Sequence, residues 1–194
     1  MNRISSVLAT ATLALFAGAG HARADAIAYT ESVIGSGSLD GQDFTDSQVT
    51  LTFTADPSTV YEPIFQIWVA DATSATVQVG SMSDTLAGPY HLFDYQPGPS
   101  VGLASGTAAS PGPDILDTDD PAFSSYNLQT TIGPITDSGA ITGNAFATDS
   151  GFFQLTSISG DVTLTAASAP EPAAIFLMGF GLLGVSAIRF VRRS

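Results

Sequence analysis

The densest group of potential ligand atoms in the chain is the acidic stretch Asp114-Ile-Leu-Asp117-Thr-Asp119-Asp120-Pro121. Calcium prefers about six to eight oxygen ligands, and aspartates at alternate positions can turn toward one cation. We therefore predict a calcium candidate at Asp117, Asp119 and Asp120, although the stretch lacks the glycine and distal glutamate of an EF-hand. The alternative is a solvated loop in which Asp119 or Asp120 caps a short helix over residues 121–128.

A second, weaker calcium candidate is the stretch Asp40-Gly-Gln-Asp43-Phe-Thr-Asp46. Aspartate and glycine also favour tight turns, because the aspartate side chain can accept a hydrogen bond from its own backbone. The alternative interpretation is therefore a hairpin turn.

His91 is the only histidine after residue 24. A Ser-His-Asp triad needs a histidine, but there is no Gly-x-Ser-x-Gly pattern, and His91 lies in a strand-like segment rich in tyrosine and phenylalanine. We predict a packed or surface histidine and no catalytic residue. Trp68 could stack on a sugar ring, but its apolar neighbours favour a place in the core.

Charge is distributed unevenly along the chain. The 194 residues have a formal net charge of −13, and 17 of the 18 acidic residues lie between Asp25 and Ala169. There is no lysine, and the five arginines lie at positions 3, 23, 189, 192 and 193. Nucleic-acid binding is excluded because it needs cations that neutralise phosphates. The absence of cysteine excludes disulfides and thiolate chemistry.

Residues 25–168 are predicted to form one all-β domain. Val49, Leu51 and Phe53 alternate with threonines, as in a half-buried strand, and further strands are predicted at 64–70, 73–79 and 90–95. Threonine-rich outer faces and strands about ten residues apart favour an antiparallel β-sandwich or jelly roll. A β-helix is the alternative, but no fixed-period repeat supports it.

Two connections are also predicted. Gly151–Ser159 and Asp161–Ala166 flank Gly160, which indicates a hairpin with a tight turn at that glycine. Residues 96–114 contain four prolines among glycines and alanines, which indicates a long loop.

The first 24 residues have the parts of a secretory signal peptide. Arg3 supplies a positive start, Val7–Ala19 is an apolar run, and Ala22-Arg23-Ala24 fits the small-x-small pattern that signal peptidase cleaves. We predict export through the Sec translocon and cleavage after Ala24. The apolar run is short for a membrane-spanning anchor.

The segment 169–194 predicts a C-terminal membrane helix. Pro170-Glu171-Pro172 precedes an uninterrupted apolar run, Ala173–Ile188, and Arg189, Arg192 and Arg193 follow it. A helix of that length spans about 24 Å, somewhat less than the roughly 30 Å hydrocarbon core, and snorkelling by Arg189 lengthens the span. Arginines stay on the cytoplasmic side, so residues 25–168 would lie across the membrane.

The order of Pro170-Glu171-Pro172, apolar helix and terminal arginine cluster resembles the PEP-CTERM sorting signal of Gram-negative bacteria. Valine commonly precedes that motif, whereas this chain has Ala169. The resemblance implies recognition by an exosortase, a membrane-embedded transpeptidase similar to cysteine proteases, and cleavage near the motif. It also implies a producer of exopolysaccharide or biofilm matrix.

These features predict a non-catalytic envelope or extracellular-matrix protein, exported across the inner membrane and transiently anchored. Exosortase, signal peptidase and the Sec translocon are the expected partners, exopolysaccharide is a candidate partner, and calcium is the only candidate cofactor. The first alternative is a calcium-dependent or carbohydrate-binding module of the matrix, and the second is a secreted hydrolase with an unrecognised site.

Overall fold

A computed structural model of the chain describes residues 26–169. The signal peptide predicted at residues 1–24 and the membrane helix predicted from Ala173 lie outside the described residues. Within residues 26–169, no helix has the length and apolar character needed to cross a membrane.

The described residues form eleven strands and two short 3-10 helices. In chain order these are β1 (Ile27–Leu39), β2 (Gln42–Ala55), η1 (Pro57–Thr59), β3 (Tyr61–Ile64), β4 (Ile67–Val79), β5 (Met82–Thr85), β6 (Tyr90–Tyr95), β7 (Ser100–Thr107), β8 (Ser110–Asp119), η2 (Pro121–Ser125), β9 (Ile132–Asp137), β10 (Ala145–Ala147) and β11 (Phe152–Ser168).

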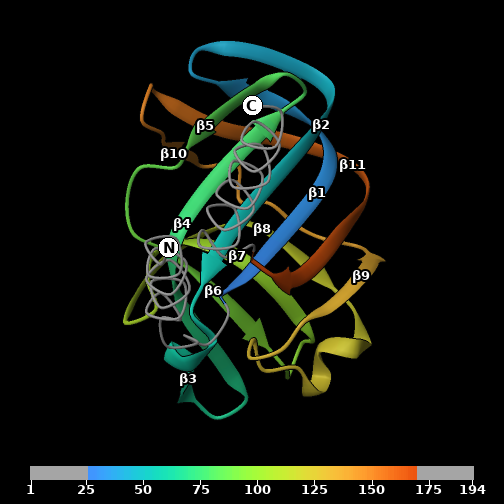
Figure 1. The fold of residues 1–194 in the computed structure, drawn as a ribbon. Coiled ribbons are helices and arrows are strands. Elements are labelled where there is room, and N and C mark those ends of the chain that lie inside the picture. The colour runs from blue at the N-terminus through green and yellow to red at the C-terminus, as the bar shows by residue number, and fades with distance from the viewer. Residues whose placement is uncertain (1–25, 170–194) are drawn as a thin grey trace, which may run out of the picture.

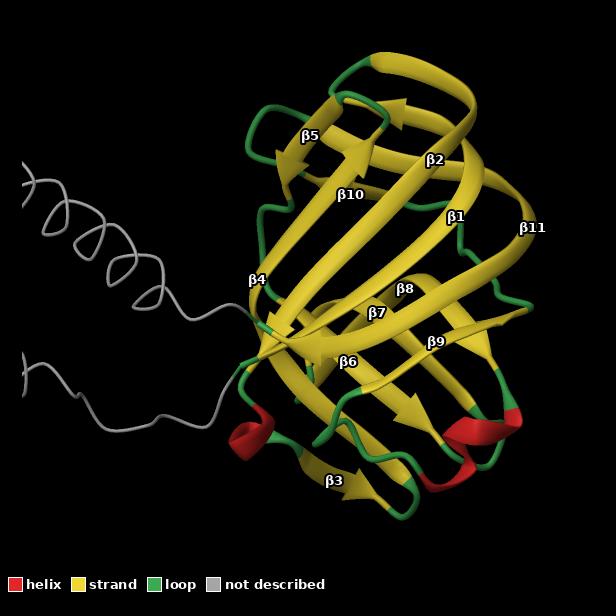
Figure 2. Ribbon diagram, turned by 45° about the vertical axis from the view of Figure 1, so that its right-hand side comes forward, coloured by secondary structure: helices red, strands yellow, loops and turns green. Residues whose placement is uncertain are grey.

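The strands form one antiparallel sheet that curls around its own hydrophobic face. Their order is β10-β11-β1-β2-β4-β6-β7-β8, with β3 and β5 paired to β4 and β9 paired to β11. In Figures 1 and 2, β1 and β2 lie in front of β6, β7 and β8. The all-β antiparallel prediction is confirmed and the arrangement is sandwich-like, but the two layers are parts of one continuous sheet.

Strand β4 joins the two layers. Its residues 72–79 pair with β2, and its residues 67–71 pair with β6, next to a register shift at Thr54 and Ala55. We call β1, β2, β5, β9, β10, β11 and residues 72–79 the first layer. We call β3, β6, β7, β8 and residues 67–71 the second layer.

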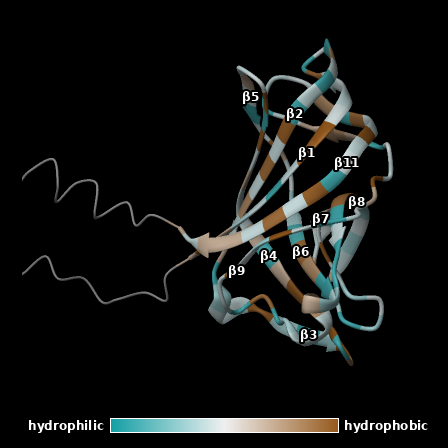
Figure 3. Cartoon of the chain, turned by 90° about the vertical axis from the view of Figure 1, so that its right-hand side faces the viewer, coloured by the Kyte–Doolittle hydropathy of each residue, from teal (hydrophilic) through white to brown (hydrophobic). Residues whose placement is uncertain are grey.

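Hydrophobic side chains from both layers form one core between them. Leu51 and Phe53 point inward from the first layer and Leu92 and Leu103 from the second, and all four are 0% exposed. Figure 3 shows the alternation of hydrophobic and hydrophilic residues along β1, β2 and β11, which is the period expected of a sheet with one buried face.

The outer edge of β8 is covered by the segment that follows β9. The N–H groups of Asp117 and Asp119 donate to the carbonyl oxygens of Ala140 and Ser138, at 3.2 and 2.8 Å. This segment therefore protects an edge that would otherwise present unpaired backbone groups.

The predicted loop at residues 96–114 is wrong, because β7 and the first half of β8 occupy it. A Cβ atom at Gly102 would lie 2.5 Å from Cζ of Phe93, so a small residue is needed where this ring crosses β7. Pro111 and Pro113 lie in β8, whose only strand partner over these residues is β7, so their missing N–H groups cost little there.

The strands predicted at 64–70 and 73–79 have different boundaries in the structure. A turn at Phe65 and Gln66 separates β3 from β4, and Gln66 adopts a positive φ of 63°. No turn interrupts the chain at Asp71, which lies inside β4.

The hairpin predicted at Gly160 is wrong, because β11 runs continuously through it. Gly160 has a φ of 75°, and the pairing of β11 with β1 shifts register beside it, between Ser32 and Ile34. Glycine with positive φ serves a bulge as well as a turn. The helix predicted at 121–128 is present as the shorter 3-10 turn η2, with Asp120 as its cap.

Candidate functional site

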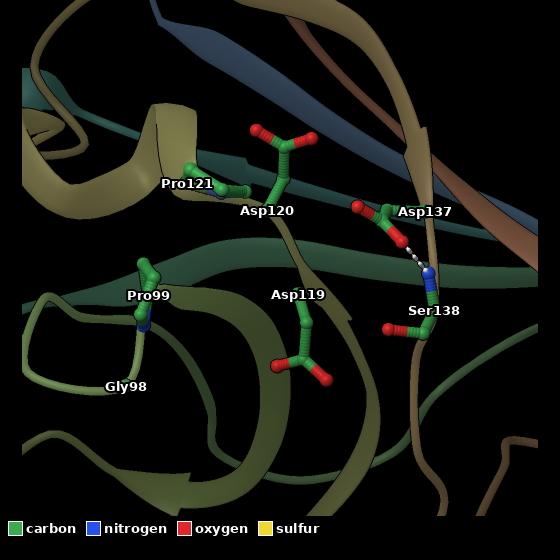
Figure 4. A pocket seen from close by; sticks show the side chains of 7 residues that line it. All are labelled: Gly98, Pro99, Asp119, Asp120, Pro121, Asp137 and Ser138. Carbon is green, nitrogen blue, oxygen red and sulfur yellow. Dashed lines mark hydrogen bonds between the residues drawn. The ribbon is translucent and has the colours of Figure 1, made fainter.

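Two of the three aspartates of the calcium hypothesis, Asp119 and Asp120, line a pocket, and Asp117 does not. Asp119 and Asp120 line this pocket of about 350 Å³, together with Asp137, Gly98 and two prolines. Figure 4 shows the carboxylates of Asp119 and Asp120 pointing to opposite sides of the chain, as expected for neighbouring residues of an extended segment. In residues 26–169, no group of three acidic or histidine side chains is arranged to hold a metal ion.

Two of these aspartates already have structural hydrogen bonds. Asp120 Oδ1 accepts a hydrogen bond from the N–H of Ala122 at 2.7 Å, which is the capping role of the alternative interpretation. Asp117 Oδ1 accepts from the N–H of Ala140 at 2.5 Å. Burial raises the pKa of Asp117, that N–H opposes the shift, and the nearby carboxylates Asp119 and Asp114 raise it further. The structure therefore gives the calcium hypothesis no preformed cluster.

The second acidic stretch forms a hairpin turn. Asp40 and Gly41 connect β1 to β2 with φ values of 53° and 78°, the left-handed region that tight hairpin turns require. Asp40 Oδ1 accepts a hydrogen bond from the hydroxyl of Thr148 at 2.5 Å, which ties the turn to the end of β10.

His91 is a packed strand residue. It is 3% exposed, and its Nδ1 lies 3.2 Å from the carbonyl oxygen of Gly106. Ser105, on the neighbouring strand β7, donates its hydroxyl to Pro113 at 3.1 Å. Trp68 is half-buried and packs against the core, as predicted.

Two buried carboxyl groups were missed by the sequence interpretation. Glu31 of β1 and Asp94 of β6 are both 0% exposed. Glu31 Oε1 accepts from the hydroxyl of Thr118 at 3.0 Å, whereas Glu31 Oε2 and both Asp94 oxygens have no hydrogen-bond partner in the described part of the chain. Burial raises the pKa of Glu31 well above its usual range and that of Asp94 to about 7. Both side chains therefore favour the neutral form in the fold.

The outer face of the second layer carries aromatic rings and carboxylates in register. Directly paired residues of antiparallel strands lie on the same face. One row across β3, β4, β6, β7 and β8 consists of Tyr61, Val69, Phe93, Gly102 and Asp117, and the next consists of Ile64, Ile67, Tyr95, Ser100 and Asp119. We call the residues of these two rows the aromatic face.

Three large side chains of this face are exposed, whereas Val69 and Ser100 of the same rows are buried, at 5% and 7% exposure. Tyr61, Ile64 and Tyr95 are 41%, 64% and 42% exposed, an unusual amount for large apolar side chains of a sheet. The rows between them, such as Leu92 and Leu103, point inward and belong to the core. The aromatic face spans five strands, about 19 Å at the usual strand spacing.

The aromatic face continues into the acidic pocket. A Cβ atom at Gly98 would lie 3.1 Å from Cε1 of Tyr95, so the ring of Tyr95 lies against this glycine. Gly98 and Asp119 both line the pocket, and Asp119 also ends the second row of the face. One connected surface therefore carries the exposed rings, the small residues Ser100 and Gly102 of β7, and the carboxylates.

The remaining predicted functional residues lie outside the described residues. These are Ala22 and Ala24 of the signal cleavage site, Pro170, Glu171 and Pro172 of the motif, and Arg189, Arg192 and Arg193 of the terminal cluster. Residues 168–193 match the family model of the PEP-CTERM protein-sorting motif. The chain therefore carries the sorting motif that an exosortase recognises, and this motif implies export and sorting to the envelope or exterior of a bacterium. No curated protein and no solved structure matches the chain.

Proposed function

We propose that the chain is a non-catalytic protein of the envelope or extracellular matrix of a Gram-negative bacterium. It is exported by the Sec translocon, loses residues 1–24 to signal peptidase and is held by its C-terminal apolar segment until an exosortase cleaves near Pro170-Glu171-Pro172. The observation that carries this proposal is the sorting motif matched at residues 168–193.

The described body supports a role that needs no catalysis. Residues 26–169 contain 16 acidic side chains and neither lysine nor arginine, so the body has no fixed cation to stabilise an anionic transition state. His91 is buried beside a backbone carbonyl rather than beside a nucleophile.

A carbohydrate-binding module of the matrix is the second candidate function. The aromatic face is the specific observation that favours it, because exposed rings beside carboxylates are suited to sugar rings and their hydroxyl groups. Calcium dependence has no comparable support in residues 26–169.

Replacing the terminal arginines tests the sorting proposal. Changing Arg189, Arg192 and Arg193 to glutamine removes the charges that fix the orientation of the apolar segment. We expect about a tenfold fall in correctly processed protein, measured by immunoblotting of membrane and medium fractions from a producer that has an exosortase.

Two further variants make the result specific. Pro170→Ala with Pro172→Ala should preserve membrane retention and block processing, so that uncleaved chain accumulates in the membrane. Asp43→Asn with Asp46→Asn, on the exposed start of β2, is the control and should leave the distribution unchanged. An unchanged distribution in the arginine variant would contradict the proposal.

A further inference from the structure

We propose that the aromatic face binds a glycan chain that bears protonated amino groups. This inference rests on the proposed function, because a protein of the envelope or extracellular matrix meets glycan chains there. It starts from the register of the second layer, which places exposed rings and carboxylates on one surface.

The rings provide the first part of the recognition. Tyr61 and Tyr95 lie in neighbouring rows of the aromatic face, and Phe93, in the row of Tyr61 and on the strand of Tyr95, extends its ring over Gly102 of β7. The apolar side of a sugar ring packs on such aromatic surfaces, and tyrosine keeps a polar tip that can hydrogen-bond to sugar hydroxyls. Strand β7 contributes only Ser100 and Gly102 to these rows, so no bulky side chain separates the rings from β8.

Charge complementarity determines which kind of glycan fits. Asp117 and Asp119 end the two rows, and Asp120 and Asp137 extend the negative charge around the adjoining pocket. Residues 26–169 contain no lysine or arginine, so an anionic polysaccharide would meet repulsion that nothing in this part of the chain offsets. A protonated amine is attracted both by these carboxylates and by the faces of the tyrosine rings.

The dimensions also suit a chain rather than a single sugar. The aromatic face runs about 19 Å from β3 to β8 at the usual strand spacing. The pocket of about 350 Å³ at the end of β8 falls in the size range of small-ligand sites and can receive one end of the chain.

The test is isothermal titration of the purified full chain, in mild non-ionic detergent, with glucosamine oligomers and with N-acetylglucosamine oligomers of equal length. The two ligands share a backbone and differ in the charge of each residue. We expect binding of the glucosamine oligomer, weakened by added salt, and about tenfold weaker binding of the acetylated oligomer.

Two pairs of variants locate the binding. Tyr61→Ala with Tyr95→Ala, and separately Asp119→Asn with Asp120→Asn, should each weaken binding about tenfold. Asparagine retains the cap of η2, so the second variant keeps the local fold. The matched controls are Phe152→Ala, an exposed aromatic residue on β11, and Asp43→Asn with Asp46→Asn, which removes the same charge from β2.

Four results would overturn the proposal. The first is the absence of binding, and the second is equal affinity for the acetylated oligomer. The third is an equal loss of affinity in the pocket variant (Asp119→Asn with Asp120→Asn) and in the β2 control (Asp43→Asn with Asp46→Asn). That result would indicate only a general attraction of a polycation to an acidic protein. The fourth is a dimer in sedimentation experiments that Tyr61→Ala with Tyr95→Ala dissociates, because a second copy would then cover the face. The sorting proposal is measured in cells, so its failure is distinguishable from failure of this one.

Discussion

The two outer faces of the molecule belong to one sheet but carry different chemistry. On the first layer, one row consists of Thr165, Thr30, Thr52 and Thr76, and the next consists of Thr163, Ser32, Thr50 and Gln78. We call these two rows the hydroxyl face. Its oxygens hydrogen-bond to one another, as in Thr30 with Thr52 and Ser32 with Thr50, both at 3.3 Å.

On the aromatic face, Asp117 Oδ1 accepts a hydrogen bond from the N–H of Ala140, but the exposed rings present apolar surface to solvent. Tyr61 and Tyr95 expose about two fifths of their surface, at 41% and 42%, and carboxylates end both rows. Exposed rings and charges of one sign are completed only by a partner, whereas neighbouring hydroxyl groups complete one another. This difference is the reason for proposing the binding site on the second layer, although both layers share strand β4.

The shared core predicts that the two layers unfold together. Leu51→Ala in the first layer and Leu103→Ala in the second each remove a fully buried side chain, and each should cost about 2–5 kcal/mol. Trp68, the only tryptophan, reports on the second layer by fluorescence, and far-UV circular dichroism reports on all strands. Urea transitions by the two probes should coincide in both variants. Separate transitions would mean that the layers are independent units.

The buried carboxyl of the second layer predicts a pH-dependent stability. Asp94 has a pKa of about 7 in the fold and an ordinary value near 3.8 when exposed. Its folded pKa is raised, so the stability is greatest below pH ~3.8, falls as pH rises toward 7, and is constant above that. The shift of about three pKa units corresponds to a loss of about 4 kcal/mol in the free energy of unfolding between the two limits.

The variant Asp94→Asn isolates this effect, because the amide cannot ionise. At pH 8 we expect the free energy of unfolding of the variant, measured by urea denaturation, to exceed that of the wild type by about 2–3 kcal/mol, after the cost of burying the amide. The free energy of unfolding of the variant should also vary less with pH. Asp161→Asn, in an exposed position of β11, is the control for loss of one charge. A variant with the wild-type pH profile would show that the fold does not raise the pKa of Asp94.

Local patterns predicted the strands but not their partners. The alternation of Val49, Leu51 and Phe53 was enough to predict a strand with one buried face, and all three are 0% exposed. Strand β1 alternates in the same way, and Glu31 occupies its inward position between Tyr29 and Val33. A charged residue at an apolar position of a strand is readable from sequence alone.

The aromatic face was not readable in this way. Tyr61 and Tyr95 belong to strands separated by the whole of β4, and only the pairing register brings them to one surface. Register is determined by turns and bulges, and these were the features that composition misassigned, as at Gly160 and at Phe65. The geometry of the calcium candidate was also not predictable from spacing, since adjacent residues such as Asp119 and Asp120 point apart on an extended chain.

Variants of the hydroxyl face are expected to change the free energy of unfolding least. Thr30→Val and Thr52→Val preserve the β-branched shape and remove one hydroxyl of a 3.3 Å pair. Each variant should change the free energy of unfolding by no more than about 0.5 kcal/mol, because water can satisfy the remaining hydroxyl. The double variant should show a coupling energy below about 0.5 kcal/mol, measured by urea denaturation. Thr45→Val, an exposed position on β2, is the control.

A larger coupling between Thr30 and Thr52 would change the contrast between the faces. A value above about 1 kcal/mol would mean that the hydroxyl pairs hold β1 against β2, since it reaches the net contribution of a typical intramolecular hydrogen bond. The hydroxyl face would then be a structural device rather than an inert surface. Because neither threonine touches the second layer, the same variants should leave glucosamine-oligomer binding unchanged, which tests directly whether the two faces act independently.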